Sequence, residues 1–187
     1  MRVISGNLKG KVLNFTKSKI TRPLKDSVKE SIFNIITHSN LINISLYNSN
    51  ILDLYSGIGS FGLECISRGA GKITFVEKDK NVVEILKKNL SDLNIKMNFT
   101  IILGEIKIFL KKDLSEKFEI IFLDPPFADK NYLQELKLLK QMKNYKKNHI
   151  VIIHREKKTS DDFQNILEPI IIKEYGRSKI IFGKFSR

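Results

Sequence analysis

The most chemically specific stretch of the sequence is Asp124-Pro125-Pro126-Phe127, which follows the apolar run 120–123. Two consecutive prolines restrict the backbone and remove two N–H donors, so the Asp124 carboxylate and the Pro125 carbonyl form a rigid corner that only accepts hydrogen bonds. Such a corner suits the exocyclic amine of a nucleic-acid base, because accepting its hydrogen bonds returns electron density to the nitrogen that attacks a methyl donor. Phe127 offers a flat ring on which an extruded base can stack. We therefore predict that all four residues are catalytic.

A glycine-rich turn predicts the second half of the site. Gly57, Gly59 and Gly62 follow the predicted strand 51–54 and lie at the start of a predicted helix. Glycine lets backbone amides approach a ligand at the edge of an α/β sheet. Read as G-x-G-x-x-G, the turn also fits a dinucleotide, and Glu77 at the end of the next strand suits the ribose hydroxyls of either kind of cofactor. The turn therefore predicts an adenosine-containing ligand.

Asp53 distinguishes between the two kinds of cofactor. Its carboxylate lies just before the glycines, where it would repel a pyrophosphate but suits the cationic amino-acid end of S-adenosylmethionine. Glu105 follows the third strand and is placed to accept a hydrogen bond from the adenine amino group, or else is a solvated acid at a helix start. We expect S-adenosyl-L-methionine as the methyl donor and S-adenosyl-L-homocysteine as the product.

Charge indicates the partner. The chain has 187 residues and a formal net charge of +13 at pH 7, which favours a polyanion, although a coding bias towards Lys, Ile and Asn is an alternative source of basicity. The basic residues concentrate near the N-terminus, where we expect Arg2, Lys9, Lys11 and Arg22 to bind RNA phosphates.

The remaining composition narrows the class of protein. The length favours a single domain, 1–187. No apolar run is long enough to span a membrane, the first residues do not resemble a signal peptide, and Cys65 is the single cysteine. We therefore expect a cytoplasmic protein with neither a membrane partner nor a metal.

The elements that position these residues follow an alternating pattern. Short β-branched runs alternate with helical periodicity, which is typical of a parallel sheet built from βαβ units. Strands are expected at 51–54, 73–76, 100–103, 120–123, 150–153, 170–175 and 179–182, and helices at 26–37, 61–68, 81–90, 106–111 and 131–143. Runs at 3–5 and 11–15 predict a basic N-terminal hairpin. The result is an α/β fold with an extension, 1–40, and a catalytic core, 41–187.

Several stretches, taken together, resemble the RsmD-type family of small-subunit ribosomal RNA guanine-N2 methyltransferases. They are 1–6, 21–23, 30–34, 52–57, 62–64, 67–70, 124–127 and 175–176. The resemblance covers essentially the whole chain. It implies a Rossmann-like, seven-stranded class I methyltransferase fold with an N-terminal β-hairpin and helix extension. It also implies that the acceptor is the N2 amine of a guanine in 16S ribosomal RNA, recognised on an assembled or assembling small subunit.

The resemblance also implies roles for individual residues. It implies a cofactor site made of Arg22, Asp53, Tyr55, Ser56, Gly57, Gly59, Glu77, Lys78, Glu105 and Ile106, with 124–127 at the reacting nitrogen. Two residues depart from the family pattern: Glu105 stands where an aspartate is usual, and His154 where an acid is more frequent. We interpret His154 as structural or solvent-facing, because no other histidine that could share a metal lies nearby.

The residues favour direct transfer to the base nitrogen over a covalent enzyme intermediate, because Cys65 lies in a predicted helix far from the Pro-Pro corner. Three alternatives remain open. A DNA or RNA adenine-N6 methyltransferase would use the same corner, although no DNA-recognition domain is visible. A nicotinamide oxidoreductase would leave Asp53 and the corner unexplained. An RNA-binding assembly factor without activity would not need 124–127 intact.

Overall fold

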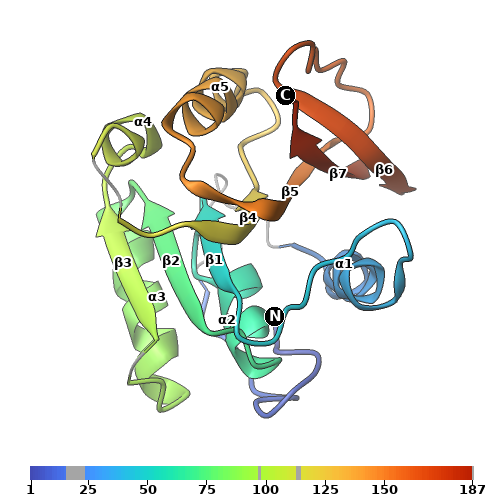
Figure 1. Cartoon of the computed structure of the whole chain (residues 1–187). Coiled ribbons are helices and arrows are strands. Elements are labelled where there is room, and N and C mark those ends of the chain that lie inside the picture. The colour runs from blue at the N-terminus through green and yellow to red at the C-terminus, as the bar shows by residue number, and fades with distance from the viewer. Residues whose placement is uncertain (16–23, 97, 113–114, 187) are drawn as a thin grey trace.

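The computed structural model describes residues 1–15, 24–96, 98–112 and 115–186. In these residues, strands and helices alternate along the chain and the strands form one seven-stranded sheet with the order β3-β2-β1-β4-β5-β7-β6 (Figure 1). The strands are β1 (Asn50–Leu54), β2 (Lys72–Glu77), β3 (Phe99–Leu103), β4 (Phe118–Leu123), β5 (Tyr145–Glu156), β6 (Leu167–Tyr175) and β7 (Ser178–Phe185). The helices are α1 (Asp26–His38), α2 (Ser60–Ser67), α3 (Lys80–Asp92), α4 (Ile106–Leu110) and α5 (Tyr132–Met142).

The sheet is mixed. β1 to β5 pair in parallel, whereas β7 lies antiparallel between β5 and β6. The C-terminal hairpin predicted from 170–175 and 179–182 therefore closes the sheet at one edge. The predicted α/β fold with seven strands is confirmed.

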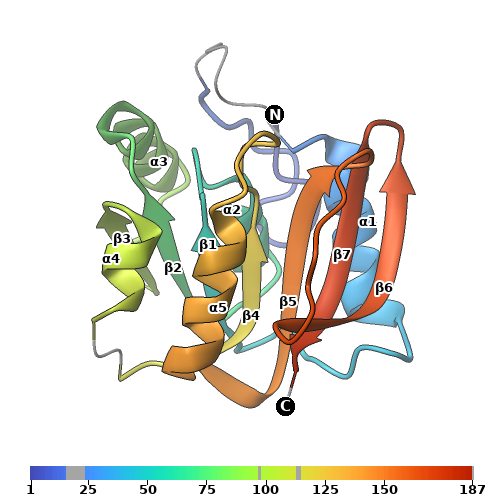
Figure 2. The same cartoon turned by 90° about the horizontal axis from the view of Figure 1, so that it is seen from above.

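Two hydrophobic layers cover the two faces of the sheet, because successive side chains of a strand point to opposite faces. Ile51 packs in the cluster that contains residues of α1, α2 and α3, whereas the next residue, Leu52, packs with residues of α4 and α5. Figures 1 and 2 show the same division, with α4 and α5 on one side of the sheet and the other three helices on the opposite side. Both faces of the central strands are thus buried, which explains their continuous apolar sequences.

The strand order creates a natural binding edge between β1 and β4. The chain moves outward from β1 to β2 and β3, then returns to place β4 on the other side of β1. At such a reversal the connections after the two central strands diverge and leave a crevice at their carboxyl ends. Asp53 lies near the end of β1, and Asp124 directly follows β4.

The N-terminal hairpin predicted from 3–5 and 11–15 is present in a shortened form. Arg2 bridges to Val12, and the N–H groups of Val3 and Leu13 are donated across the turn to the carbonyls of Lys11 and Met1 at 2.9 and 3.0 Å, but neither arm forms a full strand. The first arm does not continue as a strand, because its next two N–H groups bond to α2 instead. Those of Ile4 and Ser5 are donated to the Glu64 carboxylate on α2 at 2.7 and 2.9 Å.

The predicted fifth strand, 150–153, is much shorter than β5. The extra residues at its start include Lys146 and Lys147, whose side chains are exposed, so the apolar pattern does not reveal them. The strand nevertheless begins by pairing Tyr145 with Phe118 of β4. The other predicted strands and helices differ from the observed ones by a few residues at most.

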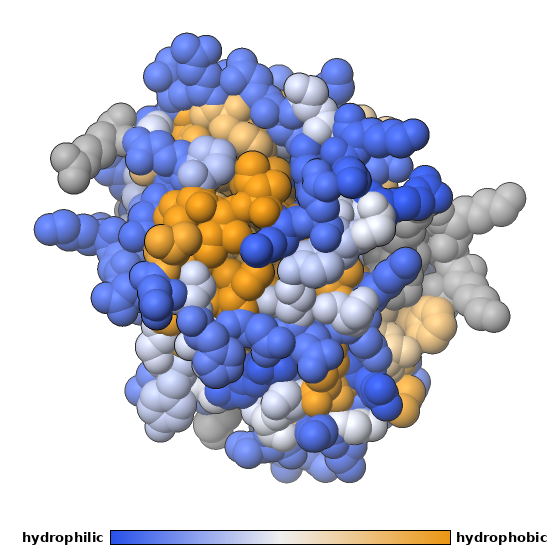
Figure 3. Space-filling model, turned by 90° about the vertical axis from the view of Figure 1, so that its right-hand side faces the viewer, coloured by the Kyte–Doolittle hydropathy of each residue, from blue (hydrophilic) through white to orange (hydrophobic). Residues whose placement is uncertain are grey.

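The surface on the β6 side is largely hydrophilic, with one large apolar patch and smaller apolar areas elsewhere on the same face (Figure 3). β6 is an edge strand, and its Ile172 is 54% exposed. Charged residues on the same strand, Lys173 and Glu174, disfavour pairing with strands of other chains. Among the described residues, no helix has the length and apolar character needed to cross a membrane.

Candidate active site

A crevice of about 1570 Å³ opens at the carboxyl edge of the sheet, across the ends of β1, β2 and β4. Twelve of the residues predicted for the site line it: Asp53, Tyr55, Ser56, Gly57, Glu77, Lys78, Glu105, Ile106, Asp124, Pro125, Pro126 and Phe127. Gly59 does not, and Arg22 lies outside the described residues. The sheet therefore brings the predicted cofactor residues and the predicted catalytic corner into one cavity.

Asp53 is 1% exposed at the floor of this crevice. Its Oδ2 accepts a hydrogen bond from the backbone N–H of Gly62 at 3.0 Å. Burial raises the pKa of Asp53 well above its usual range, and the nearby carboxylates of Asp124 and Glu77 raise it further, against the opposing effect of the Gly62 N–H. A cationic group bound here would reverse that penalty.

Glu77 holds the glycine turn in place. Its Oε2 accepts the backbone N–H of Gly57 at 3.0 Å, and its Oε1 accepts those of Lys78 and Asp79 at 2.8 and 2.9 Å. The sequence predicts Glu77 only as a partner for ribose hydroxyls. A carboxylate accepts about four hydrogen bonds, so this acid can organise the turn and still receive one from a ligand.

The turn itself depends on Gly59, which precedes α2 with φ +86°. A Cβ atom there would collide with the side chain of Leu86 on α3, so only glycine satisfies both the backbone conformation and the packing. Gly59 therefore shapes the turn from the side that packs against α3, not from the side that faces the crevice. At the front of the turn, Ser56 Oγ is buried and has no hydrogen-bond partner among the described residues.

One wall of the crevice contains a pair that the sequence did not indicate. The Tyr55 hydroxyl donates a hydrogen bond to Glu135 Oε2 on α5 at 2.6 Å. Burial raises the pKa of both groups. Tyr55 also has a left-handed backbone with φ +58°, which is unusual for a bulky residue. The hydrogen bond to Glu135 joins the loop after β1 to α5.

Glu105 and Ile106 lie at the start of α4. Ile106 is buried against the core, whereas the Glu105 side chain is 53% exposed and its Oε2 lies 3.1 Å from Lys107 Nζ. Glu105 is therefore free of the core and accessible from the crevice. Its contact with an adenine stays a prediction.

A histidine of β5 contacts the corner that follows β4. His154 Nδ1 lies 2.8 Å from Asp124 Oδ1, and the imidazole packs edge-on against the Phe127 ring with the ring centroids 5.6 Å apart. His154 is 7% exposed and lines the crevice. Of the two interpretations of His154, the structural one is confirmed and the solvent-facing one is wrong, because β5 places the side chain beside the end of β4.

The next residue of β5, Arg155, holds the backbone of the corner. Its guanidinium group donates hydrogen bonds to the carbonyl oxygens of Pro126 and Phe127 at 3.2 and 3.1 Å. Arg155 is 1% exposed, lies over the Tyr132 ring at 4.4 Å, and pairs with Asp161 at 3.4 Å. The prolines thus restrict the loop from within and Arg155 fixes it from the sheet.

The basic N-terminal residues lie outside the crevice. Arg2, Lys9 and Lys11 are exposed, and none of them lines the cavity. Arg2 Nε is 3.3 Å from the Asp26 carboxylate at the start of α1. Other parts of the same region, including Phe15, do line the cavity. The tip of the hairpin, next to Lys9, is instead held at the end of α2, where the N–H of Leu8 is donated to Ser67 Oγ at 2.9 Å.

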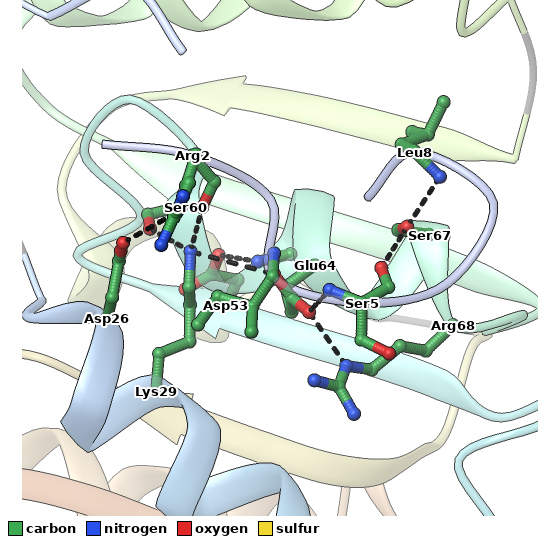
Figure 4. A network of polar contacts seen from close by, with 12 residues as sticks. Arg2, Ser5, Leu8, Asp26, Lys29, Asp53, Ser60, Glu64, Ser67 and Arg68 are labelled. Atoms are coloured by element: carbon green, nitrogen blue, oxygen red, sulfur yellow. Dashed lines mark hydrogen bonds and ion pairs between the residues drawn. The ribbon is translucent and has the colours of Figure 1, made fainter. Parts of the chain in front are cut away.

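A buried ionic network connects this region to α2 (Figure 4). Lys29 and Glu64 have fully buried side chains with Nζ and Oε2 3.6 Å apart. Lys29 also donates to the carbonyl of Arg2 at 2.7 Å, and Glu64 pairs with Arg68 Nε at 2.8 Å. Because Glu64 also accepts two N–H groups of the N-terminal segment, that segment is fixed to the helix that begins at the glycine turn.

Comparisons with known proteins agree with this architecture. A family model described as "Conserved hypothetical protein 95" matches residues 1–184. Ribosomal RNA small subunit methyltransferase D of Buchnera aphidicola subsp. Acyrthosiphon pisum is 36% identical over 158 residues, which are 84% of this chain and 79% of that protein.

Two solved structures have the same fold. That of HI0767 from Haemophilus influenzae, described as a candidate methylase, is 31% identical with a TM-score of 0.73 and covers 97% of this chain and 96% of its own. That of yhhF from Escherichia coli, described as a candidate methyltransferase, has a TM-score of 0.81 at 24% identity and covers 100% of this chain and 99% of its own. The predicted class I methyltransferase fold and the family resemblance are therefore confirmed, and the chain belongs to the Conserved hypothetical protein 95 family, with ribosomal RNA small subunit methyltransferase D among its relatives.

Proposed function

We propose that this protein transfers the methyl group of S-adenosylmethionine to the exocyclic N2 amine of a guanine in small-subunit ribosomal RNA. The observation that carries this proposal is the meeting, in one crevice, of a buried carboxylate at Asp53 and the acceptor corner at 124–127. The curated relative named a ribosomal RNA small subunit methyltransferase supports the choice of RNA, and the guanine follows the family resemblance.

The residues at the β1 and β2 ends fit the proposed cofactor. Asp53 offers a buried carboxylate to the cationic amino-acid end, Ser56 Oγ is a buried polar atom without a partner among the described residues, and Glu77 retains acceptor capacity for ribose hydroxyls. S-adenosylmethionine supplies an electrophilic methyl group on its sulfonium and leaves as S-adenosylhomocysteine. Gly57, Tyr55, Lys78, Glu105 and Ile106 line the same cavity and complete the proposed site.

At the corner, Asp124 and the Pro125 carbonyl are proposed to accept the two hydrogens of the base amine. The nitrogen lone pair then forms the new N–C bond as the S–C bond breaks, and the proton lost from nitrogen goes to Asp124 or to solvent. Most of the rate would come from positioning and from acceptors that need no reorganisation. Cys65 does not line the crevice, and burial raises its thiol pKa well above the usual value, which supports a transfer without a cysteine nucleophile.

The experiment that tests the function is mass mapping of small-subunit ribosomal RNA from cells with and without the gene. The proposal expects one guanine to lose a methyl group when the gene is deleted and to regain it when purified protein and S-adenosylmethionine are added. Loss of a methyl from an adenine instead would identify a different acceptor. Unchanged RNA would refute the proposal. We propose that the RNA is recognised on an assembled or assembling small subunit, which implies a cytoplasmic location. We also propose that residues 1–187 act as a single methyltransferase domain.

Cofactor binding should release protons because of Asp53. Its pKa is raised in the free protein, so the carboxyl group stays protonated at pH values where an ordinary aspartate is ionised. The ammonium group of S-adenosylhomocysteine favours the carboxylate and lowers that pKa, so affinity should increase with pH until Asp53 is ionised before binding. Calorimetry in buffers of different ionisation enthalpy measures the released protons. Asp53→Asn should bind more weakly and release fewer; equal proton release in both proteins would contradict the assignment.

The N-terminal cations should bind phosphates. Replacing Lys9 and Lys11 by glutamate should weaken RNA binding and reduce the dependence of log K on log salt concentration by roughly one to two, because each phosphate contact releases about one counterion. The modified guanine should stay the same. Filter binding at several salt concentrations measures the slope. The same double charge reversal at Lys143 and Lys147, two exposed lysines around the start of β5, is the control, and equal effects would mean that only total charge matters.

A further inference from the structure

His154 is the one hydrogen-bonding partner of the Asp124 carboxylate among the described residues. The Nδ1–Oδ1 distance is 2.8 Å, and the histidine is almost fully buried. The register of the sheet explains this contact. Leu123 and Ile153 are partners in the parallel pair β4–β5, so the residues that follow them, Asp124 and His154, lie side by side. Both side chains therefore stand on a rigid edge.

The environment of the imidazole indicates which nitrogen carries the proton. An ionised carboxylate only accepts hydrogen bonds, so Nδ1 must donate to Asp124. Nε2 is buried and has no partner within the part of the chain that the structure describes. A proton on Nε2 would be a buried donor without an acceptor, which is unfavourable. The geometry thus places a proton on Nδ1, which donates to the Asp124 carboxylate.

We propose that His154 is a positioning residue for methyl transfer, which rests on the function proposed above. Its Nδ1–H fixes the Asp124 side chain through Oδ1 and leaves Oδ2 as the acceptor for the substrate amine. An aspartate without this partner can rotate about its side-chain bonds, so only part of its population would face the amine. His154 thereby does for the carboxylate what Arg155 does for the loop carbonyls.

Two substitutions separate the hydrogen bond from the ring. In His154→Asn the side-chain amide nitrogen takes the place of Nδ1, so the donor is kept and the ring is lost. In His154→Phe the ring and its contact with Phe127 are kept, and the donor is lost. We expect the single-turnover rate of His154→Phe to fall by about 10–100-fold, as for other partners that orient an active-site group, while the affinity for S-adenosylhomocysteine is unchanged. His154→Asn should keep most of the rate.

His149→Asn is the matched control, because this histidine lies on the same strand, is 5% exposed and does not line the crevice. Thermal unfolding of every variant separates lost stability from lost rate. His154→Phe at the wild-type rate would overturn the inference, and so would His154→Asn as slow as His154→Phe, since the ring would then be what matters. A wild-type protein that transfers no methyl group to ribosomal RNA would instead refute the proposed function.

Nitrogen NMR tests the contact independently of any substrate. In protein with labelled histidine, the His154 ring should show a protonated Nδ1, and Asp124→Ala should shift the Nδ1 resonance. An Nδ1 without a proton, or a resonance that does not respond to Asp124→Ala, would overturn the inference even if methyl transfer to RNA is observed.

Discussion

Asp124→Ala should lower the rate of methyl transfer by at least about 10²–10³-fold, the usual loss when a preorganised group that stabilises the transition state is removed. The loss should appear in kcat and in the single-turnover rate, because the carboxylate is proposed to act on the amine as its nitrogen attacks. Binding of S-adenosylhomocysteine should be largely kept, since Asp53 and Glu77 are intact.

Asp129→Ala is the control for this variant. Asp129 lies five residues further along the same loop, where its carboxylate accepts the backbone N–H of Asn131 at 2.7 Å. Removing it deletes an equal charge without deleting the acceptor at the corner. Transfer by Asp124→Ala to the same guanine at the Asp129→Ala rate would mean that the Asp124 carboxylate takes no part in the chemistry.

Glu64→Ala should destabilise the protein by about 3–5 kcal/mol, the usual loss when one partner of a buried ion pair is removed. For a chain of this size that corresponds to a fall of roughly 6–20 °C in the unfolding temperature. The physical reason is that the Lys29 ammonium group stays buried without its carboxylate, and the N–H groups of Ile4 and Ser5 lose their acceptor. Urea unfolding followed by circular dichroism measures the change.

Two further variants make this result specific. Lys29→Met should cost less than Glu64→Ala, because Glu64 then keeps Arg68 and two backbone donors. Glu84→Ala removes an exposed acid that pairs with Lys87 on α3, and should leave the free energy of unfolding almost unchanged. If Glu64→Ala were as stable as Glu84→Ala, the buried network would contribute nothing to the fold.

The strands were predictable because burial on both faces leaves a continuous apolar sequence, as in Ile120 to Leu123. The pattern did not reveal the first residues of β5, where the backbone pairs while charged side chains stay in solvent. For the N-terminal segment it predicted the hairpin but overestimated the length of its strands. There Val3 and Leu13 are buried as a hairpin predicts, but the N–H of Ile4 bonds to Glu64 on α2. Local periodicity cannot predict a contact between residues so far apart in the sequence.

The residues of the crevice were predictable because parallel strands deliver their carboxyl ends to one edge. The partners of those residues were not. Glu77 was expected to face a ligand, and its three backbone donors come from loop geometry that no spacing rule contains. His154 had a usable signal that was missed, since aligning the ends of the apolar runs 120–123 and 150–153 places it beside Asp124.

The attachment of the N-terminal segment to α2 has a consequence for synthesis of the chain. The N–H of Ile4 can form its hydrogen bond only after Glu64 has been synthesised, 60 residues later, and that of Asn14 only after Asn89, 75 residues later. At about 5–20 residues per second, the interval for Ile4 is roughly 3–12 s. The N-terminal segment is therefore docked only after β1 and α2 exist, and the surface that carries Lys9 and Lys11 is completed late in folding although it is synthesised before them.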